Sequence, residues 1–136
     1  MNNFFLPIAL VVLFTGNASA QTVVPAKNAG KHIGKTVKIC DKVFGGRLLT
    51  PSNITLLDIG ANSPNQELTI MIPSACRDKF KGRPEVDYRG KDVIVTGKLA
   101  VYNGKPEIVI TRPEQLKMVL IDNSLKRAVP VKQPIH

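Results

Sequence analysis

Few side chains in this 136-residue chain could carry out covalent chemistry, and their spacing matches no catalytic pattern. The two histidines are His32 and His136, and neither combines with a serine or cysteine into a recognisable nucleophile–base set. No phosphate-binding loop of the GxxxxGK[ST] kind is present. The aspartates that could hold a metal are spread along the chain: Asp41, Asp58, Asp87 and Asp92. The sequence therefore predicts a binding protein rather than an enzyme, with no cofactor and no metal site.

The only cysteines, Cys40 and Cys76, lack the CxxC spacing of a redox pair and are too few for a structural zinc site. The leader described below would carry them into an oxidising compartment, where disulfides form. We predict a Cys40–Cys76 disulfide, closing a loop of about 36 residues and stabilising the fold by roughly 3–4 kcal/mol. Two buried free thiols or an intermolecular bond are the alternatives.

The remaining candidates are ligand-binding side chains, because a formal net charge of +9 favours anionic partners. Single-stranded nucleic acid requires a basic groove with aromatic platforms. Phe44 and Tyr102 are the plausible platforms, and both lie beside basic residues. Each has a plainer interpretation, Phe44 as a core plug and Tyr102 as hairpin packing. Lys98 and Arg112 could likewise be a solvated rim. The full candidate set is Lys42, Phe44, Arg47, Lys98, Tyr102, Lys105 and Arg112.

Two functions stay open on these residues. The first is binding of single-stranded nucleic acid or another anionic polymer. The second is a structural or interaction module that binds an envelope protein or an acidic glycan. The charge favours the first, although a basic exported protein that avoids aggregation would carry the same charge. Only four aromatic residues follow residue 20, which favours the second. Oligomeric state is left open.

The first twenty residues predict a signal peptide, and hence an exported protein, periplasmic or secreted. The apolar run over residues 4–14 is too short to span a bilayer core of about 30 Å. Ala18-Ser19-Ala20 fits the small-x-small cleavage pattern. We expect cleavage after Ala20 and no transmembrane segment in the mature chain. The predicted order is a signal peptide over 1–20, one domain over 21–118, and a basic, disordered tail over 119–136.

Five segments with β-strand patterns are expected to position the candidate residues. In residues 36–44, Val37, Ile39 and Val43 share one face. The other face is formed by Lys38, Cys40 and Lys42. That period of two is typical of a half-buried strand, and Gly45-Gly46 is expected to end it. The other predicted strands cover residues 54–60, 67–72, 92–102 and 105–111.

The connections between these strands favour one architecture. Asn103-Gly104 predicts a two-residue hairpin with both residues at positive φ. Gly97 suggests either a bulge or a sharp coil of its strand. Residues 74–80 are typical of a short helix, and Phe80 and Tyr88 are expected to cover the end of the fold. Five strands with a helix between the third and fourth predict an all-β protein with a short helix, a five-stranded OB-fold Greek-key barrel. Such barrels bind across strands two and three and the adjoining loops, where most candidates lie.

Three stretches also carry a family resemblance. They are HIGKTVKICDKV (32–43), PNQELTIMIP (64–73) and YRGKDVIVTGKLAVYNGKPEIVITRPEQL (88–116). Over residues 26–118 the chain resembles a family of small exported bacterial OB-fold domains described as nucleic-acid-binding-like. The resemblance implies the barrel fold, and it implies a nucleic-acid ligand only by analogy.

Overall fold

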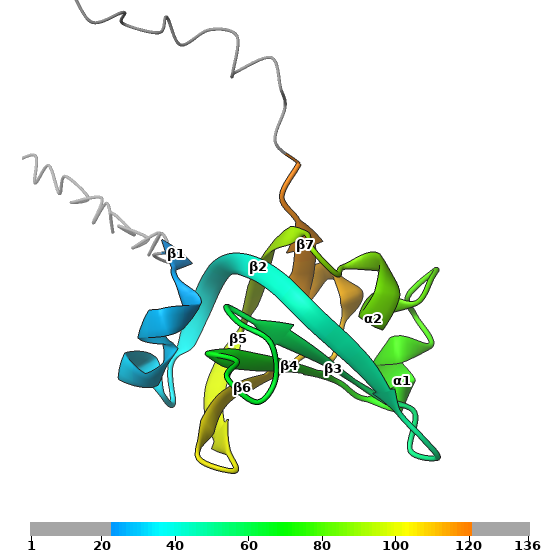
Figure 1. Cartoon of the computed structure of the whole chain (residues 1–136), viewed down its shortest axis with the longest axis horizontal. Helices are drawn as coiled ribbons and strands as arrows, with labels where there is room; N and C mark the ends of the chain where they lie inside the picture. Colours follow the sequence, from blue (N-terminus) through cyan, green and yellow to red (C-terminus); the bar gives the residue numbers. More distant parts are fainter. Residues whose placement is uncertain (1–22, 121–136) are drawn as a thin grey trace, which may run out of the picture.

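The computed structural model describes residues 23–120, which form a mostly β structure with a few short helices (Figure 1). The predicted signal peptide, and the predicted tail beyond residue 120, lie outside the described residues. No helix within residues 23–120 is long and apolar enough to cross a bilayer. The elements are β1 (Val23–Val24), η1 (Ala26–His32), β2 (Thr36–Leu49), β3 (Ile54–Ile59), β4 (Leu68–Ile72), α1 (Ser74–Arg77), α2 (Pro84–Asp87), β5 (Asp92–Tyr102), β6 (Lys105–Val109), η2 (Pro113–Gln115) and β7 (Leu116–Met118).

Five of the strands close into a ring. β2 pairs antiparallel with β3, and β3 pairs antiparallel with β4. β4 then pairs in parallel with β6, β6 pairs antiparallel with β5, and β5 returns to β2. β1 and β7 add short edges beside β2 and β5. All five strands predicted from the sequence are present, whereas β1, β7 and α2 were not expected.

β2 belongs to both sides of the ring. Residues 36–42 pair with β5, and residues 43–49 pair with β3. The change of partner coincides with a register shift between Val43 and Gly45. The prediction that Gly45-Gly46 ends the strand is therefore wrong. A Cβ on Gly46 would lie 2.9 Å from the backbone of Glu85, so the glycine lets β2 continue in close contact with α2.

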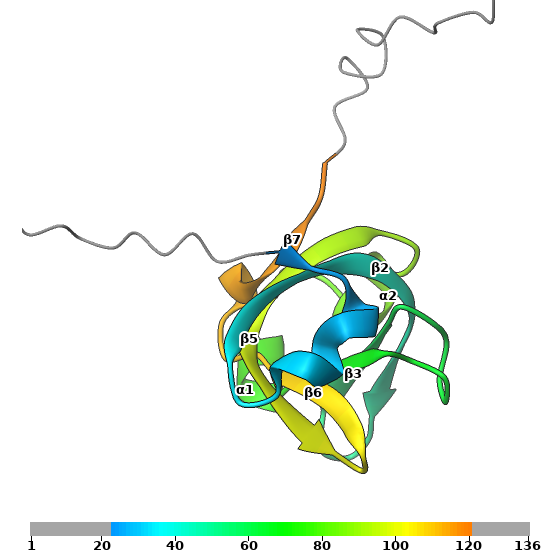
Figure 2. The same cartoon turned by 90° about the vertical axis from the view of Figure 1, so that its left-hand side faces the viewer.

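The inward faces of the strands form the core. Ile39, Leu57, Ile70, Val95 and Ile108 are fully buried there, as the alternation of apolar residues requires. Each open end of the ring is covered: η1 lies across one end, and α1 and α2 lie at the other (Figures 1 and 2).

An ion pair fastens the two helices of that second end. The Arg77 guanidinium of α1 donates to the Glu85 carboxylate of α2, with Nη2 to Oε1 at 3.1 Å, and to the Thr55 hydroxyl of β3 at 2.6 Å. The side chains are 15% and 6% exposed for Arg77 and Glu85. The hydrogen bond from Arg77 lowers the pKa of Glu85. This carboxylate therefore stays ionised at a lower pH than an ordinary glutamate does.

The predicted Cys40–Cys76 disulfide is not present, because both residues are free thiols. Cys76 lies in α1 and is buried in the core. Cys40 alternates with the inward Val37 and Ile39 along β2, so its half-buried side chain lies on the opposite, outer face of the strand. Strand β2 therefore lies between the two sulfur atoms. Burial raises the pKa of both thiols, which disfavours the reactive thiolate.

The two glycine predictions on β5 and β6 had different outcomes. The hairpin is confirmed, since Asn103 and Gly104 have φ of 49° and 74°. The bulge at Gly97 is wrong, because pairing with β2 runs in register through it. A Cβ there would lie 2.5 Å from the Ile108 side chain, so the glycine is explained by close packing between strands.

Candidate functional site

The outer face of β3, β4 and β6 is hollowed into a groove bordered by β2 and the β5–β6 hairpin. Its polar half, about 130 Å³, is lined by Arg47, Gln66, Thr69, Tyr102, Lys105 and Glu107 among others. Its apolar half, about 240 Å³, is lined by Leu49, Ile54, Leu56, Met71, Tyr102 and Glu107. The two hollows share Leu56, Tyr102 and Glu107, so we treat them as one site and call it the groove.

A row of side chains on adjacent strands underlies the polar half, and Thr69 and Glu107 of this row line it. Asp58 on β3 pairs in register with Thr69 on β4, and Thr69 pairs with Glu107 on β6. Residues in register project to the same face, so this row crosses the outer surface of the sheet. Asp58 is only 4% exposed, and its Oδ2 lies 3.7 Å from Arg47 Nη1 at the edge of the groove.

The floor offers hydrogen-bond acceptors more than donors. Gln66 donates from Nε2 to the Thr69 hydroxyl at 3.2 Å, which turns its Oε1 away from that bond. Gln66 Oε1 and Asp58 Oδ1 are buried and accept no hydrogen bond within residues 23–120. Partial burial raises the pKa of Glu107, so water only incompletely solvates its carboxylate. A ligand that fits this floor must bring hydrogen-bond donors.

The rim supplies one aromatic ring and two cations. Tyr102 is 64% exposed at the end of β5, directly before the tight turn at Asn103. Lys105 follows that turn, and its Nζ donates to the carbonyl of Pro64 in the loop before β4. The hairpin therefore holds Tyr102 at the edge of the groove with its ring available to a ligand.

The seven predicted ligand contacts fall into four places. Arg47, Tyr102 and Lys105 meet in the groove. Lys42 and Phe44 lie together where β2 changes partner, with the Lys42 ammonium 5.7 Å from the centroid of the Phe44 ring. Phe44 is 38% exposed, so it is not a core plug.

The last two candidates lie elsewhere. Lys98 is exposed on β5, opposite Thr36. Arg112 lines a separate cavity at the helical end of the ring. The candidates therefore do not form one surface. The half-buried residues Gln66 and Glu107 were missed by sequence reasoning, because no local pattern shows that the loop before β4 and the outward side of β6 lie at the same hollow.

Among residues 23–120, no cluster of three or more histidine, cysteine, aspartate or glutamate side chains could hold a metal ion.

Comparison with known proteins assigns no family to this chain. No protein-family model matches it, and no curated protein matches it. Among solved structures, it is similar to an aspartyl-tRNA synthetase from Leishmania major Friedlin, with a TM-score of 0.47 and 13% sequence identity. The match covers 76% of this chain and 22% of that chain. What the groove binds must therefore be inferred from its own side chains.

Proposed function

We propose that this chain is an exported OB-fold binding protein, without catalytic activity, that holds single-stranded nucleic acid in the groove. The strand pairings support the five-stranded Greek-key barrel. Numbering β2 to β6 as strands one to five, the first pairs with the second and fourth, and the third pairs in parallel with the fifth. The binding surface of such barrels includes the face of strands two and three, which here are β3 and β4.

One observation carries the choice of ligand: a stacking ring, two cations and recessed acceptors line the same hollow. A base stacked on Tyr102 gains about 1–3 kcal/mol. The neighbouring phosphates would lie against Arg47 and Lys105. The edge of the base would then meet the Glu107 carboxylate, which accepts hydrogen bonds, beside the Gln66 side chain.

This arrangement favours bases that carry an exocyclic amino group. Adenine and cytosine each present such a donor, whereas thymine presents acceptors and a methyl group at the corresponding edge. With a single aromatic ring, the groove anchors one base, and the rest of the strand contributes through its phosphates. We therefore expect modest affinity, strong dependence on salt, and a preference for cytosine or adenine over thymine.

The direct test is a binding titration of the mature protein with dC, dA and dT oligonucleotides of equal length, at two salt concentrations. Tighter binding of dC or dA than of dT, lost in Tyr102→Ala and Glu107→Gln but retained in Tyr102→Phe, supports the proposal. Equal binding of all three, or binding unaffected by Tyr102→Ala, contradicts it.

A separate measurement tests the predicted signal peptide. The intact mass of the exported protein should correspond to a mature chain that starts at Gln21.

The apolar half of the groove favours a second candidate function, that of an interaction module for an envelope protein. There, an apolar side chain of the partner would pack between Leu49, Ile54 and Met71, and a partner lysine or arginine would pair with Glu107. Met71→Asp would then abolish binding of the partner while oligonucleotide binding through Tyr102 persists. The same variant therefore separates the two candidates.

A further inference from the structure

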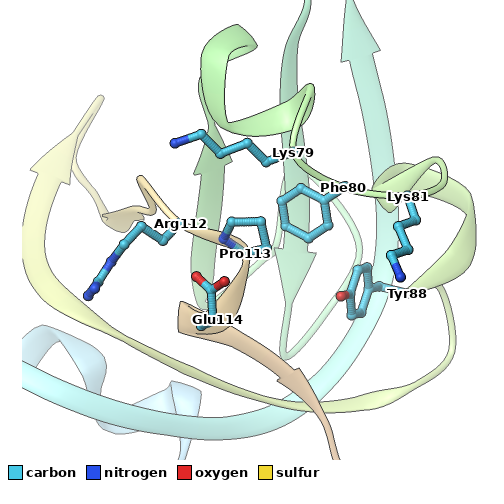
Figure 3. Close-up of a pocket in the computed structure, with 7 residues that line it drawn as sticks. All are labelled: Lys79, Phe80, Lys81, Tyr88, Arg112, Pro113 and Glu114. Carbon is cyan, nitrogen blue, oxygen red and sulfur yellow. The ribbon is translucent and has the colours of Figure 1, made fainter.

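A second cavity lies at the helical end of the ring, outside the groove. It has a volume of about 520 Å³ and lies among the segment after α1, the residue that follows α2, and η2 (Figure 3). Small-molecule sites typically range from about 300 to 1,000 Å³, so the cavity is large enough for a compact ligand. Its lining residues are Lys79, Phe80, Lys81, Tyr88, Arg112, Pro113 and Glu114. None of them lines the groove.

The charges around this cavity are unbalanced. Lys79, Lys81 and Arg112 supply three positive charges, against the single carboxylate of Glu114. Within residues 23–120 the ion pairs are made by Arg47, Arg77 and Arg83, so none engages a cation of the cavity. Cations that border a cavity and are not engaged in ion pairs provide a favourable setting for an anion.

The wall of the cavity is apolar and aromatic. Phe80 and Tyr88 pack edge to face, with ring centroids 6.2 Å apart and an interplanar angle of 89°. Both rings also pack against the core, and burial raises the pKa of the Tyr88 hydroxyl. That hydroxyl therefore stays protonated and able to donate a hydrogen bond at neutral pH.

The cations surround this aromatic pair on two sides. In Figure 3 the Lys81 amino group lies beside the Tyr88 ring, and Pro113 lies between Phe80 and Arg112. Lys79 and Arg112 are exposed, so their long side chains can rotate toward a ligand on the ps–ns timescale. A charged group and a flat ring could thus be held at once.

We propose that this cavity binds a phosphate monoester whose molecule also contains a flat ring, such as a nucleoside monophosphate. The phosphate lies among Lys79, Lys81 and Arg112, and the ring packs against Phe80 and Tyr88. The ligand is either a free nucleotide or the phosphorylated end of a strand. The proposal does not depend on nucleic-acid binding in the groove.

Glu114 and the cations should have opposite effects on the affinity for an anion. Its carboxylate repels an anion, so Glu114→Gln should strengthen binding, whereas Lys81→Gln should weaken it. Each effect should be about three- to fivefold, the size of an exposed charge pair. The second pKa of a phosphate monoester is about 6, so affinity should rise as pH increases from 5 to 7 and the dianion forms.

Isothermal titration of the mature protein with adenosine monophosphate, adenosine and inorganic phosphate tests the site. We expect the monophosphate to bind about tenfold more tightly than the nucleoside, as one charge-assisted hydrogen bond would give. The triple variant of Lys79, Lys81 and Arg112 to glutamine should remove that advantage. Lys42→Gln is the matched control, since it removes the same charge outside the cavity and should leave affinity unchanged.

Three results would overturn the proposal. They are equal affinity for adenosine and its monophosphate, an equal loss in Lys42→Gln and Lys81→Gln, and loss of monophosphate binding in Tyr102→Ala. The last would place the ligand in the groove. Oligonucleotides with and without a terminal phosphate then identify the source. Tighter binding of the phosphorylated strand assigns a chain end, and no difference assigns a free nucleotide.

Discussion

The groove and the helical-end cavity belong to the same ring, yet different kinds of group lie deepest in each. In the groove, the acceptors Gln66 and Glu107 lie on the floor, and Arg47 and Lys105 form the rim. In the cavity, aromatic rings form the wall, and Lys81 lies at the side of the Tyr88 ring. The net charge of +9 therefore says little about either site. What a site selects depends on the groups that water reaches least.

The largest expected effect comes from the Arg77–Glu85 ion pair, which fastens the helical end but not the groove. Glu85→Ala leaves the Arg77 guanidinium buried without its partner, which should lower the free energy of unfolding by about 3 kcal/mol. Because α1 and α2 lead into the cavity wall, cavity binding should weaken more than groove binding. Urea denaturation and the two titrations measure this. The double variant Arg77→Met, Glu85→Leu should recover most of the stability, and failure to recover it would contradict the ion-pair explanation.

Low pH should weaken the same ion pair and lower the stability of the fold. The folded-state pKa of Glu85 is lowered, so its contribution to stability is fully present above the unfolded value of about 4.3. That contribution is lost as pH falls through the lower folded-state pKa. Denaturation curves across this range should show a decline in wild type that is smaller in Glu85→Gln. An equal decline in both would place the acid sensitivity elsewhere.

The next effect concerns affinity alone. Tyr102 is 64% exposed, so Tyr102→Ala should leave unfolding unchanged while weakening oligonucleotide binding by about 1–3 kcal/mol. Binding of adenosine monophosphate in the cavity should not change. Fluorescence anisotropy and thermal melts together check this. A parallel loss for both ligands would place the monophosphate in the groove and contradict the cavity proposal.

A smaller effect is expected at Glu107, where ionisation should lower the stability of the fold but strengthen ligand binding. Burial raises the folded-state pKa of Glu107, so the ionised carboxylate lowers stability as pH rises through that value. Binding should show the opposite trend, because the carboxylate accepts from the base only when ionised. Glu107→Gln should therefore weaken dC binding by about 1 kcal/mol without lowering the melting temperature. A titration against pH in wild type and variant provides the measurement.

The smallest effect lies in the salt dependence. Arg47→Ala and Lys105→Ala should each flatten the slope of log affinity against log salt by about 0.7 for a single-stranded ligand. Lys98→Ala removes the same charge outside the groove and serves as the control. An equal change in all three variants would indicate diffuse attraction to the basic surface. A truncation after residue 118 checks the contribution of the predicted tail.

Local patterns predicted the strands well and the site only in part. Alternation located all five ring strands, and Asn103-Gly104 predicted the hairpin that presents Tyr102. The same alternation placed Cys40 on the outer face, yet the disulfide prediction relied on compartment chemistry and was wrong. Strand faces are thus a stronger guide to a disulfide than the presence of two cysteines.

The missed features depend on neighbours distant in sequence. Glu107 lies beside Thr69 only because β4 and β6 pair in parallel, and no local pattern specifies that register. The helical-end cavity needs α2, where no helix was predicted. Pro84 at its first position, followed by Glu85, was an available indication of a helix start.

The shared strand β2 also has a consequence for the order of folding. A chain emerges from its amino end, so the second half of β2 can pair with β3 almost at once. The first half must wait for residues 92–98. Until then Thr36–Lys42 is an unpaired edge that another chain could join. We therefore expect β2, β3 and β4 to form the folding nucleus, and the seam between β2 and β5 to close last, as long-range pairing requires.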